Sequence, residues 1–318
     1  MSQPATPDFA ALAARIPASI RFGTSTWNYP GWKGLVYHLD YPERGPSARM
    51  LEEYARFPLF RTVGIDSSFY GPPTPATLRR YAAHLPPGFP CVSKVWDRIT
   101  VHTFVKARYP TRAGEENPEF LDAGVFLREV YEPYAQHFAE HAGPFVFEFQ
   151  AIARMSAQEF ADRLDGFLAQ LPREGRYGVE VRNPEFLSPP YLAVLREHNV
   201  AHVFNAWTRM PSIGEQVATP GVFTAPFVVA RALLRPGRPY AEAVEAFAPY
   251  DRIREPNPQL RGDLVELIRR ALALRIPAYV LVNNRAEGNA PLTIVAVAGL
   301  LAAGSESGGA EKGQPAPV

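Results

Sequence analysis

Strand-like and helix-like segments alternate along most of this chain, and this alternation limits the folds that it can adopt. Short runs rich in β-branched and aromatic residues are typical of buried strands. Eight such runs are present, at residues 20–25, 62–66, 90–95, 144–150, 177–182, 201–206, 227–233 and 278–283. Eight parallel strands, each followed by a helix, close into a barrel. We therefore expect an α/β fold, a single (β/α)8 barrel of the TIM type.

Helical patterns fill most of the intervals between these runs. We expect helices at 49–57, 75–84, around 119–141, at 156–170, from Ser188-Pro189 and at 260–274. A doubly wound open sheet is the alternative, but no Gly-x-Gly-x-x-Gly turn opens the chain. The stretches 100–117 and 207–224 are longer than ordinary connections, so we expect long loops at the carboxyl face that build or cover a site.

The chain ends differ from this pattern. Residues 1–15 are weakly patterned, and we expect a flexible N-terminus. Residues 304–318 are low in apolar content, and we expect a disordered tail. No low-complexity linker interrupts residues 16–303, which we therefore take as one domain.

Composition excludes several classes of protein. No apolar run is long enough to cross a bilayer, and the first residues lack the pattern of a signal peptide, so we expect no membrane partner. The single cysteine, Cys91, excludes an intramolecular disulfide framework and suits a cytoplasmic location. With 33 Lys and Arg against 32 Asp and Glu, the net charge of +1 gives no reason to expect duplex nucleic acid as a partner.

Every predicted strand ends in polar side chains. In a β/α barrel the catalytic groups lie at the carboxyl ends of the strands, and side chains alternate between inward and outward directions. In strand order, the inward polar or aromatic positions are Ser25 and Trp27; Asp66 and Ser68; Lys94; Glu148 and Gln150; Glu180 and Arg182; Asn205; Arg231; and Asn283 or Asn284. Their convergence on one mouth favours a binding site over eight separately solvated strand ends.

The charges at this mouth indicate what it would bind. Lys94, Arg182 and Arg231 bring three cations together, and arginine binds phosphate or carboxylate through two parallel hydrogen bonds. We therefore expect an anionic small molecule. The loops 233–239 and 283–289 carry the glycine and arginine of a phosphate-binding loop, although their arginines would serve equally well as a solvated rim.

A metal site is the less favoured alternative. Asp66, Glu148 and Glu180 could ligate a divalent cation, but no pair of histidines lies at a strand end and the neighbouring cations would compete for the carboxylates. We assign no metal ligands, and the cofactor stays unassigned. His102 is a candidate for proton transfer, or a surface loop histidine.

An aromatic loop, residues 26–32, follows the first strand. Its Trp27 and Tyr29 would stack on a sugar or a base, or form a hydrophobic lid.

These motifs resemble the YecE-like family, a bacterial and archaeal family of unassigned function. The resemblance runs from about Phe22 to Leu301. It rests on Gly23-Thr24-Ser25-Thr26-Trp27, Ser67-Ser68-Phe69-Tyr70, Ser93-Lys94, Val179-Glu180-Val181-Arg182-Asn183 and Asn283-Asn284. It implies a TIM-type barrel. The chain departs from the family pattern at Asp66, at the stretched run that ends in His102, and in the loop after the seventh strand.

Our leading hypothesis is an enzyme that acts on a phosphorylated or otherwise anionic small molecule by hydrolytic or other acid/base chemistry. The catalytic candidates are Glu180, Asp66, His102 and Lys94. The ligand-binding candidates are Arg182, Arg231, Asn205, Asn283, Asn284, Gln150, Trp27, Tyr29, Tyr70, Ser25 and Ser68. A non-catalytic nucleotide or single-stranded nucleic-acid binding protein and a metal-dependent phosphoesterase stay open, as does the oligomeric state.

Overall fold

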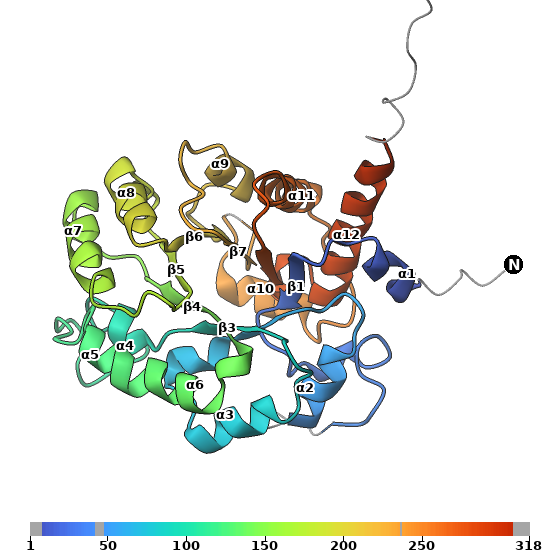
Figure 1. Ribbon diagram of the computed structural model, residues 1–318, viewed down its shortest axis with the longest axis horizontal. Coiled ribbons are helices and arrows are strands. Elements are labelled where there is room, and N and C mark those ends of the chain that lie inside the picture. The colour runs from blue at the N-terminus through green and yellow to red at the C-terminus, as the bar shows by residue number, and fades with distance from the viewer. Residues whose placement is uncertain (1–7, 42–47, 236, 308–318) are drawn as a thin grey trace, which may run out of the picture.

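Eight parallel strands form the centre of the molecule in the computed structural model, which describes residues 8–41, 48–235 and 237–307 (Figure 1). The strands are β1 Ile20–Thr24, β2 Val63–Ile65, β3 Cys91–Lys94, β4 Ala142–Glu148, β5 Tyr177–Glu180, β6 Ala201–Ala206, β7 Val228–Ala232 and β8 Ala278–Val282. Each begins and ends within two residues of its prediction. The fold is a TIM-type β/α barrel, as predicted.

Consecutive strands are hydrogen-bonded neighbours from β2 to β8, and β8 then pairs with β1. The remaining seam, between β1 and β2, is bridged at Phe22 and Phe60, which makes the barrel nearly closed. Glycine permits the close approach at this seam. A Cβ on Gly23 would lie 2.1 Å from the carbonyl oxygen of Thr62, which no side chain could occupy without moving the backbone.

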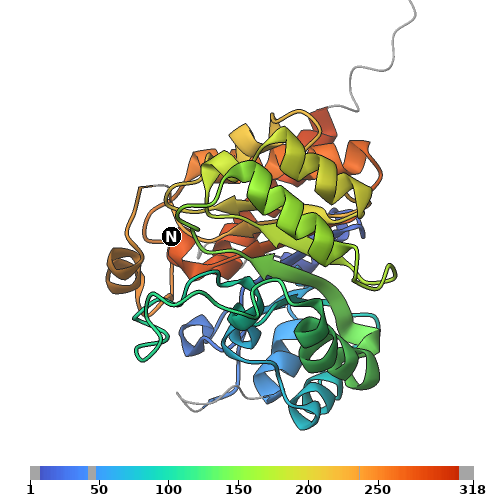
Figure 2. The same cartoon turned by 90° about the vertical axis from the view of Figure 1, so that its left-hand side faces the viewer.

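Helices surround the strands (Figure 2). The predicted helices are α2 Ala48–Ala55, α3 Pro75–Ala82, α5 Ala123–Phe126, α6 Glu132–His137, α7 Ala157–Leu168, α8 Pro189–Glu197 and α11 Pro258–Ala273, with a π-helical turn Leu127–Tyr131 between α5 and α6. Those we did not predict are α1 Phe9–Ala14, α4 Asp97–Thr100, α9 Ile213–Val217, α10 Tyr240–Phe247 and α12 Ala290–Ser307. Short 3-10 turns occupy Pro30–Trp32, Asp66–Tyr70, Ala139–His141, Pro184–Phe186 and Asn284–Ala286. No helix in the described part of the chain is long and apolar enough to span a bilayer.

Part of the segment for which we expected flexibility is helical, since α1 covers Phe9–Ala14. Asp8 caps α1 by accepting a hydrogen bond from the backbone of Ala11 at 2.9 Å. The Arg61 guanidinium donates to the backbone carbonyls of Ala13 and Ile16, so it ties the end of α1 to the barrel. The predicted tail begins as the last turn of α12, and residues 1–7 and 308–318 lie outside the described residues.

The apolar core of the described residues has two main parts, beside a small third cluster of Leu233, Leu234, Ala243 and Phe247. The larger part lies between the strands and the surrounding helices, and a smaller part fills the inside of the barrel. The inner part consists of Val92, Val146, Ala201, Val203, Phe227, Val229, Tyr279 and Leu281. We call these eight residues the apolar plug, and charged side chains lie beyond it at both ends of the barrel. The fold therefore separates a carboxyl mouth from an amino mouth.

Candidate functional site

Arg231 of β7 is the centre of an ionic cluster at the carboxyl mouth. Its Nη1 donates to Glu148 at 2.6 Å and to Glu180 at 2.5 Å, and its Nη2 donates to Asp66 at 2.9 Å. The Arg231 side chain is only 2% exposed. One guanidinium therefore joins the ends of β2, β4, β5 and β7.

Arg182 lies on the other side of the same carboxylates. Its Nη2 lies 2.5 Å from Glu180 and 3.1 Å from Glu148, and its guanidinium stacks 4.0 Å from the centre of the Trp207 ring. Its Nε and Nη1 are buried and have no hydrogen-bond partner. Arg182 is thus held in a fixed orientation by two carboxylates and one indole, with two donor groups left unused.

Lys94, at the end of β3, is the third cation of the cluster. Its Nζ lies 2.9 Å from Glu148 and 3.8 Å from the centre of the Phe69 ring. Gln150 completes the environment of Glu148 by donating to its other oxygen at 2.7 Å. Glu148 therefore contacts all three cations and an amide.

The cluster is electrically balanced, with three cations and three carboxylates. Burial by itself would raise the pKa of Glu148, but the charges of Lys94 and the two arginines hold it well below its ordinary value. Burial likewise opposes the charge on Arg231, but the three carboxylates around it raise its pKa well above the ordinary value. Both groups therefore stay ionised at neutral pH.

A cavity of about 410 Å³ opens above this cluster. That volume is within the range of small-molecule sites. Besides members of the cluster, its walls comprise Thr26, Asn28, Tyr29, Ser67, Phe69, Tyr70, Gln150, Trp207, Leu233, Tyr240, Asn283 and Arg285. Arg285 lies 4.4 Å from the centre of the Tyr240 ring and, within the described residues, forms no ion pair. It is the cation of this cavity that no carboxylate neutralises.

Nine of the predicted site residues meet at this mouth. Glu180 lies in the cluster, and the cavity walls contain Asp66, Lys94, Arg182, Arg231, Gln150, Asn283, Tyr29 and Tyr70. Asn283 uses its side-chain oxygen to accept from the backbone of Arg285 at 3.0 Å. Tyr70 is 65% exposed and lies at the rim. Three of the nine, Lys94, Glu180 and Arg231, lie within strands, and the other six lie in the segments that follow strand ends.

Five predicted ligand contacts are structural instead. Trp27 is buried against Tyr81, with ring centres 5.1 Å apart. Asn284 accepts hydrogen bonds from Trp32 and from the backbone of Ala290 at 3.1 and 2.9 Å. Ser25 is buried outside the walls of the cavity. Ser25 and Trp27 follow the last residue of β1, where the alternation of a strand no longer applies.

The other two lie beneath the mouth. Ser68 lies in a 3-10 turn, and its hydroxyl donates to backbone carbonyls, including that of Lys94 at 2.6 Å. Asn205 is fully buried and donates to the carbonyl of Val181 at 3.3 Å. Neither side chain lies in the wall of the cavity.

His102 also lies apart from the mouth. Its ring packs edge-on against Phe120, with ring centres 5.1 Å apart, and its Nδ1 lies 3.0 Å from the Thr103 hydroxyl. It is not part of the cavity wall. Its position in the loop after β3 therefore does not support the proton-transfer role that we considered.

Some wall residues were missed by the sequence reasoning. Trp207 directly follows β6 and opens a loop that we expected to cover a site, so its position was a usable signal. Arg285 lies in the loop after β8 that we compared with a phosphate-binding loop. Nothing in the sequence placed Tyr240 at the mouth, because it begins α10, a helix that we did not predict.

The carboxylates of the cluster are committed to cations. Within the described residues no group of three or more His, Cys, Asp or Glu side chains is arranged to hold a metal ion. The donors that a divalent cation would need are here hydrogen-bonded to guanidinium and ammonium groups.

The fold and the site together define a TIM-type barrel with a buried ionic cluster and a polar, aromatic-walled cavity at its carboxyl mouth. The chain belongs to the family described as protein of unknown function DUF72, which matches residues 21–317. This is the YecE-like family, so the resemblance seen in the sequence is confirmed.

Solved structures of the same family share the fold. A DUF72 family protein of Enterococcus faecalis V583 is 19% identical and has a TM-score of 0.62, with 89% of this chain and 95% of that chain covered. A DUF72 family protein of Thermotoga maritima MSB8 is 18% identical and has a TM-score of 0.60, with 90% and 99% covered. These likenesses establish the architecture. No curated protein matches the chain.

Proposed function

We propose that this protein is an enzyme that acts at its carboxyl mouth on a small molecule carrying a phosphate or carboxylate, by hydrolytic or other acid/base chemistry. The observation that carries the proposal is the buried, charge-balanced cluster beneath the cavity. Buried ion pairs rarely stabilise a fold better than apolar packing would, and clusters of ionised groups in clefts mark functional sites. Their position at the carboxyl ends of barrel strands agrees with the usual place of catalysis.

In this proposal Arg285 binds the anionic group of the ligand. Arg231 is saturated by three carboxylates, and a ligand could reach it only by displacing one of them. Arg285 requires no such displacement, and its guanidinium can pair with two oxygens of a phosphate or carboxylate. We therefore assign Arg231, which we first considered as an anion ligand, to holding the carboxylates in place. We assign Arg182 to the same role because its Nη2 pairs with Glu148 and Glu180 and its other donors are buried.

The rest of the ligand would lie against the aromatic wall. Tyr29, Tyr70, Tyr240 and Trp207 line the cavity, and aromatic faces suit the apolar face of a sugar or a base. The amides of Asn28, Asn283 and Gln150 lie in the same wall and supply donors and acceptors for hydroxyl groups. This combination favours a sugar-phosphate-like or nucleotide-like substrate.

Asp66 and Lys94 are the groups that we propose for proton transfer. Asp66 is 26% exposed, the most accessible carboxylate of the cluster, and within the described residues it forms an ion pair only with Arg231. Lys94 is 11% exposed and lies beside Glu148 in the cavity wall. Glu180 is fully buried between two arginines, so we now assign it to positioning instead of proton transfer.

A binding screen with matched ligands tests this proposal. Sugar phosphates, nucleoside monophosphates and sugar acids would each be compared with the neutral counterpart by thermal shift, since a ligand at 100 times its Kd adds about 2.7 kcal/mol of stability. We expect stabilisation by at least one anionic member, loss of that preference in Arg285→Met, and retained binding without turnover in Asp66→Asn. Equal stabilisation by anionic and neutral partners, or an unaffected Arg285→Met, would reject the proposal.

Single-stranded nucleic acid is less well supported. A groove beside the mouth combines Tyr70, Trp96, Phe104 and Tyr109 with Arg98, Arg108 and Arg112. Each of these arginines, however, is paired with a neighbouring carboxylate: Glu119, Asp97 or Glu115. A groove with balanced charge lacks the excess of cations that a phosphate backbone requires.

A further inference from the structure

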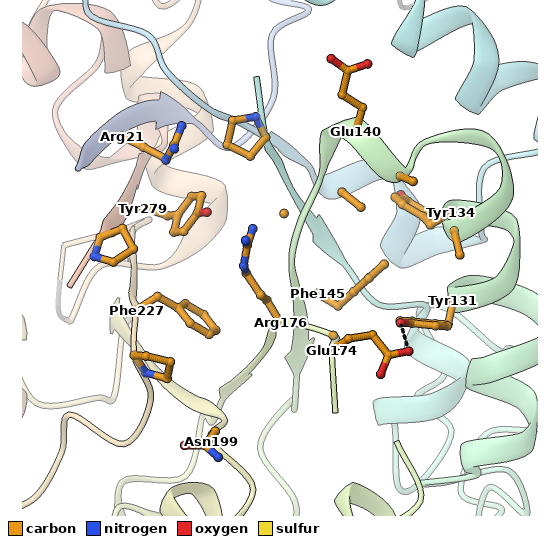
Figure 3. Close-up of a pocket in the computed structure, with 18 of the residues that line it drawn as sticks. Arg21, Tyr131, Tyr134, Glu140, Phe145, Glu174, Arg176, Asn199, Phe227 and Tyr279 are labelled. Atoms are coloured by element: carbon orange, nitrogen blue, oxygen red, sulfur yellow. Dashed lines mark hydrogen bonds between the residues drawn. The ribbon is translucent and has the colours of Figure 1, made fainter. Parts of the chain in front are cut away.

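A second cavity, of about 770 Å³, lies at the amino mouth of the barrel, on the far side of the apolar plug (Figure 3). Figure 3 shows Arg21, Tyr279 and Phe227 on one side of this cavity and Tyr131 and Glu174 on the other, with Arg176 between them. We propose that this cavity is a ligand site separate from the carboxyl mouth, which binds a ring-bearing small molecule through its phosphate or carboxylate group.

Arg21 is the cation that a barrel strand contributes to this cavity. It lies on β1 in register with Tyr279 of β8, and its guanidinium lies 5.8 Å from the centre of the Tyr279 ring. Its Nε is buried and has no hydrogen-bond partner, and no ion pair within the described residues includes it. Arg21 as a whole is half-buried, but a buried Nε–H without a partner is costly, and a ligand anion would supply the missing acceptor.

No neighbouring group offsets the charge of Arg21. Arg61 is close enough that its pKa is lowered, first by burial and then by repulsion from Arg21. The donors of Arg61 are already bonded to backbone carbonyls, including those of Ile16 and Pro17, so it adds positive charge without needing an anion of its own. The electrostatic potential around Arg21 is therefore positive.

Two further arginines line this cavity. Arg173 and Arg176 lie in the turn before β5, both are exposed, and neither forms an ion pair in the part of the chain that the structure describes. The two carboxylates in the same wall are engaged: Glu174 accepts from the Tyr131 hydroxyl, and Glu140 accepts from the backbone of Gly88, each at 3.3 Å. Three cations against two carboxylates leave an excess positive charge, whereas the carboxyl mouth has a balanced cluster.

The remaining wall suits a ring. Phe145, Phe227, Tyr131 and Tyr279 line the cavity, together with the proline that precedes β8. The volume is within the range of sites for ligands of nucleotide size. The amino face of a TIM barrel usually serves stability, in which case Arg21 would only close the barrel and bind nothing.

Titration calorimetry on the full chain with three probes distinguishes a ligand-binding role of this cavity from a purely structural one. Adenosine monophosphate carries both a ring and an anion, adenosine carries only the ring, and inorganic phosphate carries only the anion. We expect adenosine monophosphate to bind at least tenfold more tightly than phosphate and adenosine not to bind. Adenosine binding as tightly as its phosphate, or phosphate binding as tightly as the nucleotide, would overturn the proposed chemistry, and so would absence of binding by all three.

Variants locate the binding. Measured in an Arg285→Met background, which removes the anion ligand proposed for the carboxyl mouth, Arg21→Met and Arg176→Met should each weaken the binding of adenosine monophosphate at least tenfold, whereas the exposed control Arg163→Met should not change it. Arg176 is exposed, so its variant tests the site even if Arg21→Met does not fold. Unchanged affinity in Arg176→Met and Arg21→Met, or loss of affinity in Arg285→Met alone, would place the nucleotide at the other mouth and overturn the proposal.

Discussion

Replacing Arg231 by methionine should destabilise the protein severely, and in a pH-dependent way. Methionine keeps much of the volume but removes a guanidinium that three carboxylates share, so the net charge of the cluster falls from zero to −1. Removing one partner from a buried ion pair costs about 3–5 kcal/mol. Lys94 and Arg182 remain to compensate part of the charge, so we expect a loss of about 4 kcal/mol at pH 7.

The sign of the pH dependence follows from the excess negative charge. In Arg231→Met a cluster carboxylate should have a folded-state pKa above its unfolded value of about 4.3. The stability that this carboxylate contributes is fully present below about pH 4.3 and is lost as pH rises through the folded-state pKa. In the unchanged protein Glu148 has a lowered pKa, so its contribution is present above its unfolded pKa and is lost only as pH falls through the folded pKa. The stability difference between the two proteins should therefore shrink between pH 7 and pH 5.

Urea unfolding followed by circular dichroism at these two pH values measures the difference. Adding Glu180→Gln to Arg231→Met restores neutrality and should recover about 2 kcal/mol at pH 7, since it removes the unpaired charge. Arg163→Met, which removes an exposed pair with Glu159, is the matched control and should cost no more than about 0.5 kcal/mol. An Arg231→Met protein within about 1 kcal/mol of the unchanged chain, or a difference that is the same at both pH values, would refute the reasoning.

Two other perturbations test different parts of the barrel. Burial lowers the pKa of His202 to about 4. Between about pH 6.5 and the folded-state pKa, His202 is protonated in the unfolded protein but not in the folded one, so lowering the pH across this window should reduce the free energy of unfolding by up to about 3 kcal/mol. His202→Gln should remove this pH dependence of the free energy of unfolding. Gly23→Ala should destabilise the protein by more than about 2 kcal/mol, because the added Cβ would overlap the Thr62 carbonyl. Gly166→Ala has open space on an exposed helix face and should stabilise the protein by about 0.5 kcal/mol or more. If both variants melted at the same temperature as the unchanged protein, both expectations would be contradicted.

The strands were predictable because their apolar sequences match the buried positions that they occupy in the barrel. Each is a short apolar run bounded by turn residues, and both of its faces are buried in a barrel. Helix α12 was missed for the related reason that it packs against α1, α11, β1 and β8 and is apolar on most of its surface, which leaves no helical period to detect. The short helices α1 and α9 depend on caps at Asp8 and Ser212, which are weak signals beside those of a long amphipathic helix.

The members of the ionic cluster were predictable, but their partners were not. Alternation along β5 and β7 indicates that Glu180 and Arg231 point inward, which the structure bears out. It cannot indicate how far each side chain extends into the barrel, and that reach decides which carboxylate each cation meets. It also fails beyond a strand end, as Trp27 shows, because the backbone turns and the next side chain packs into the core.

The saturation of Arg231 decides between the two candidate anion ligands at the carboxyl mouth. A ligand that bound Arg231 would have to break a buried contact to Asp66, Glu148 or Glu180, at a cost of about 3–5 kcal/mol, which exceeds what a single charged hydrogen bond returns. A ligand that bound Arg285 would break no ion pair. The two arginines should therefore differ in their effects: Arg231 governs the stability of the fold, and Arg285 governs affinity for the anion with little effect on stability.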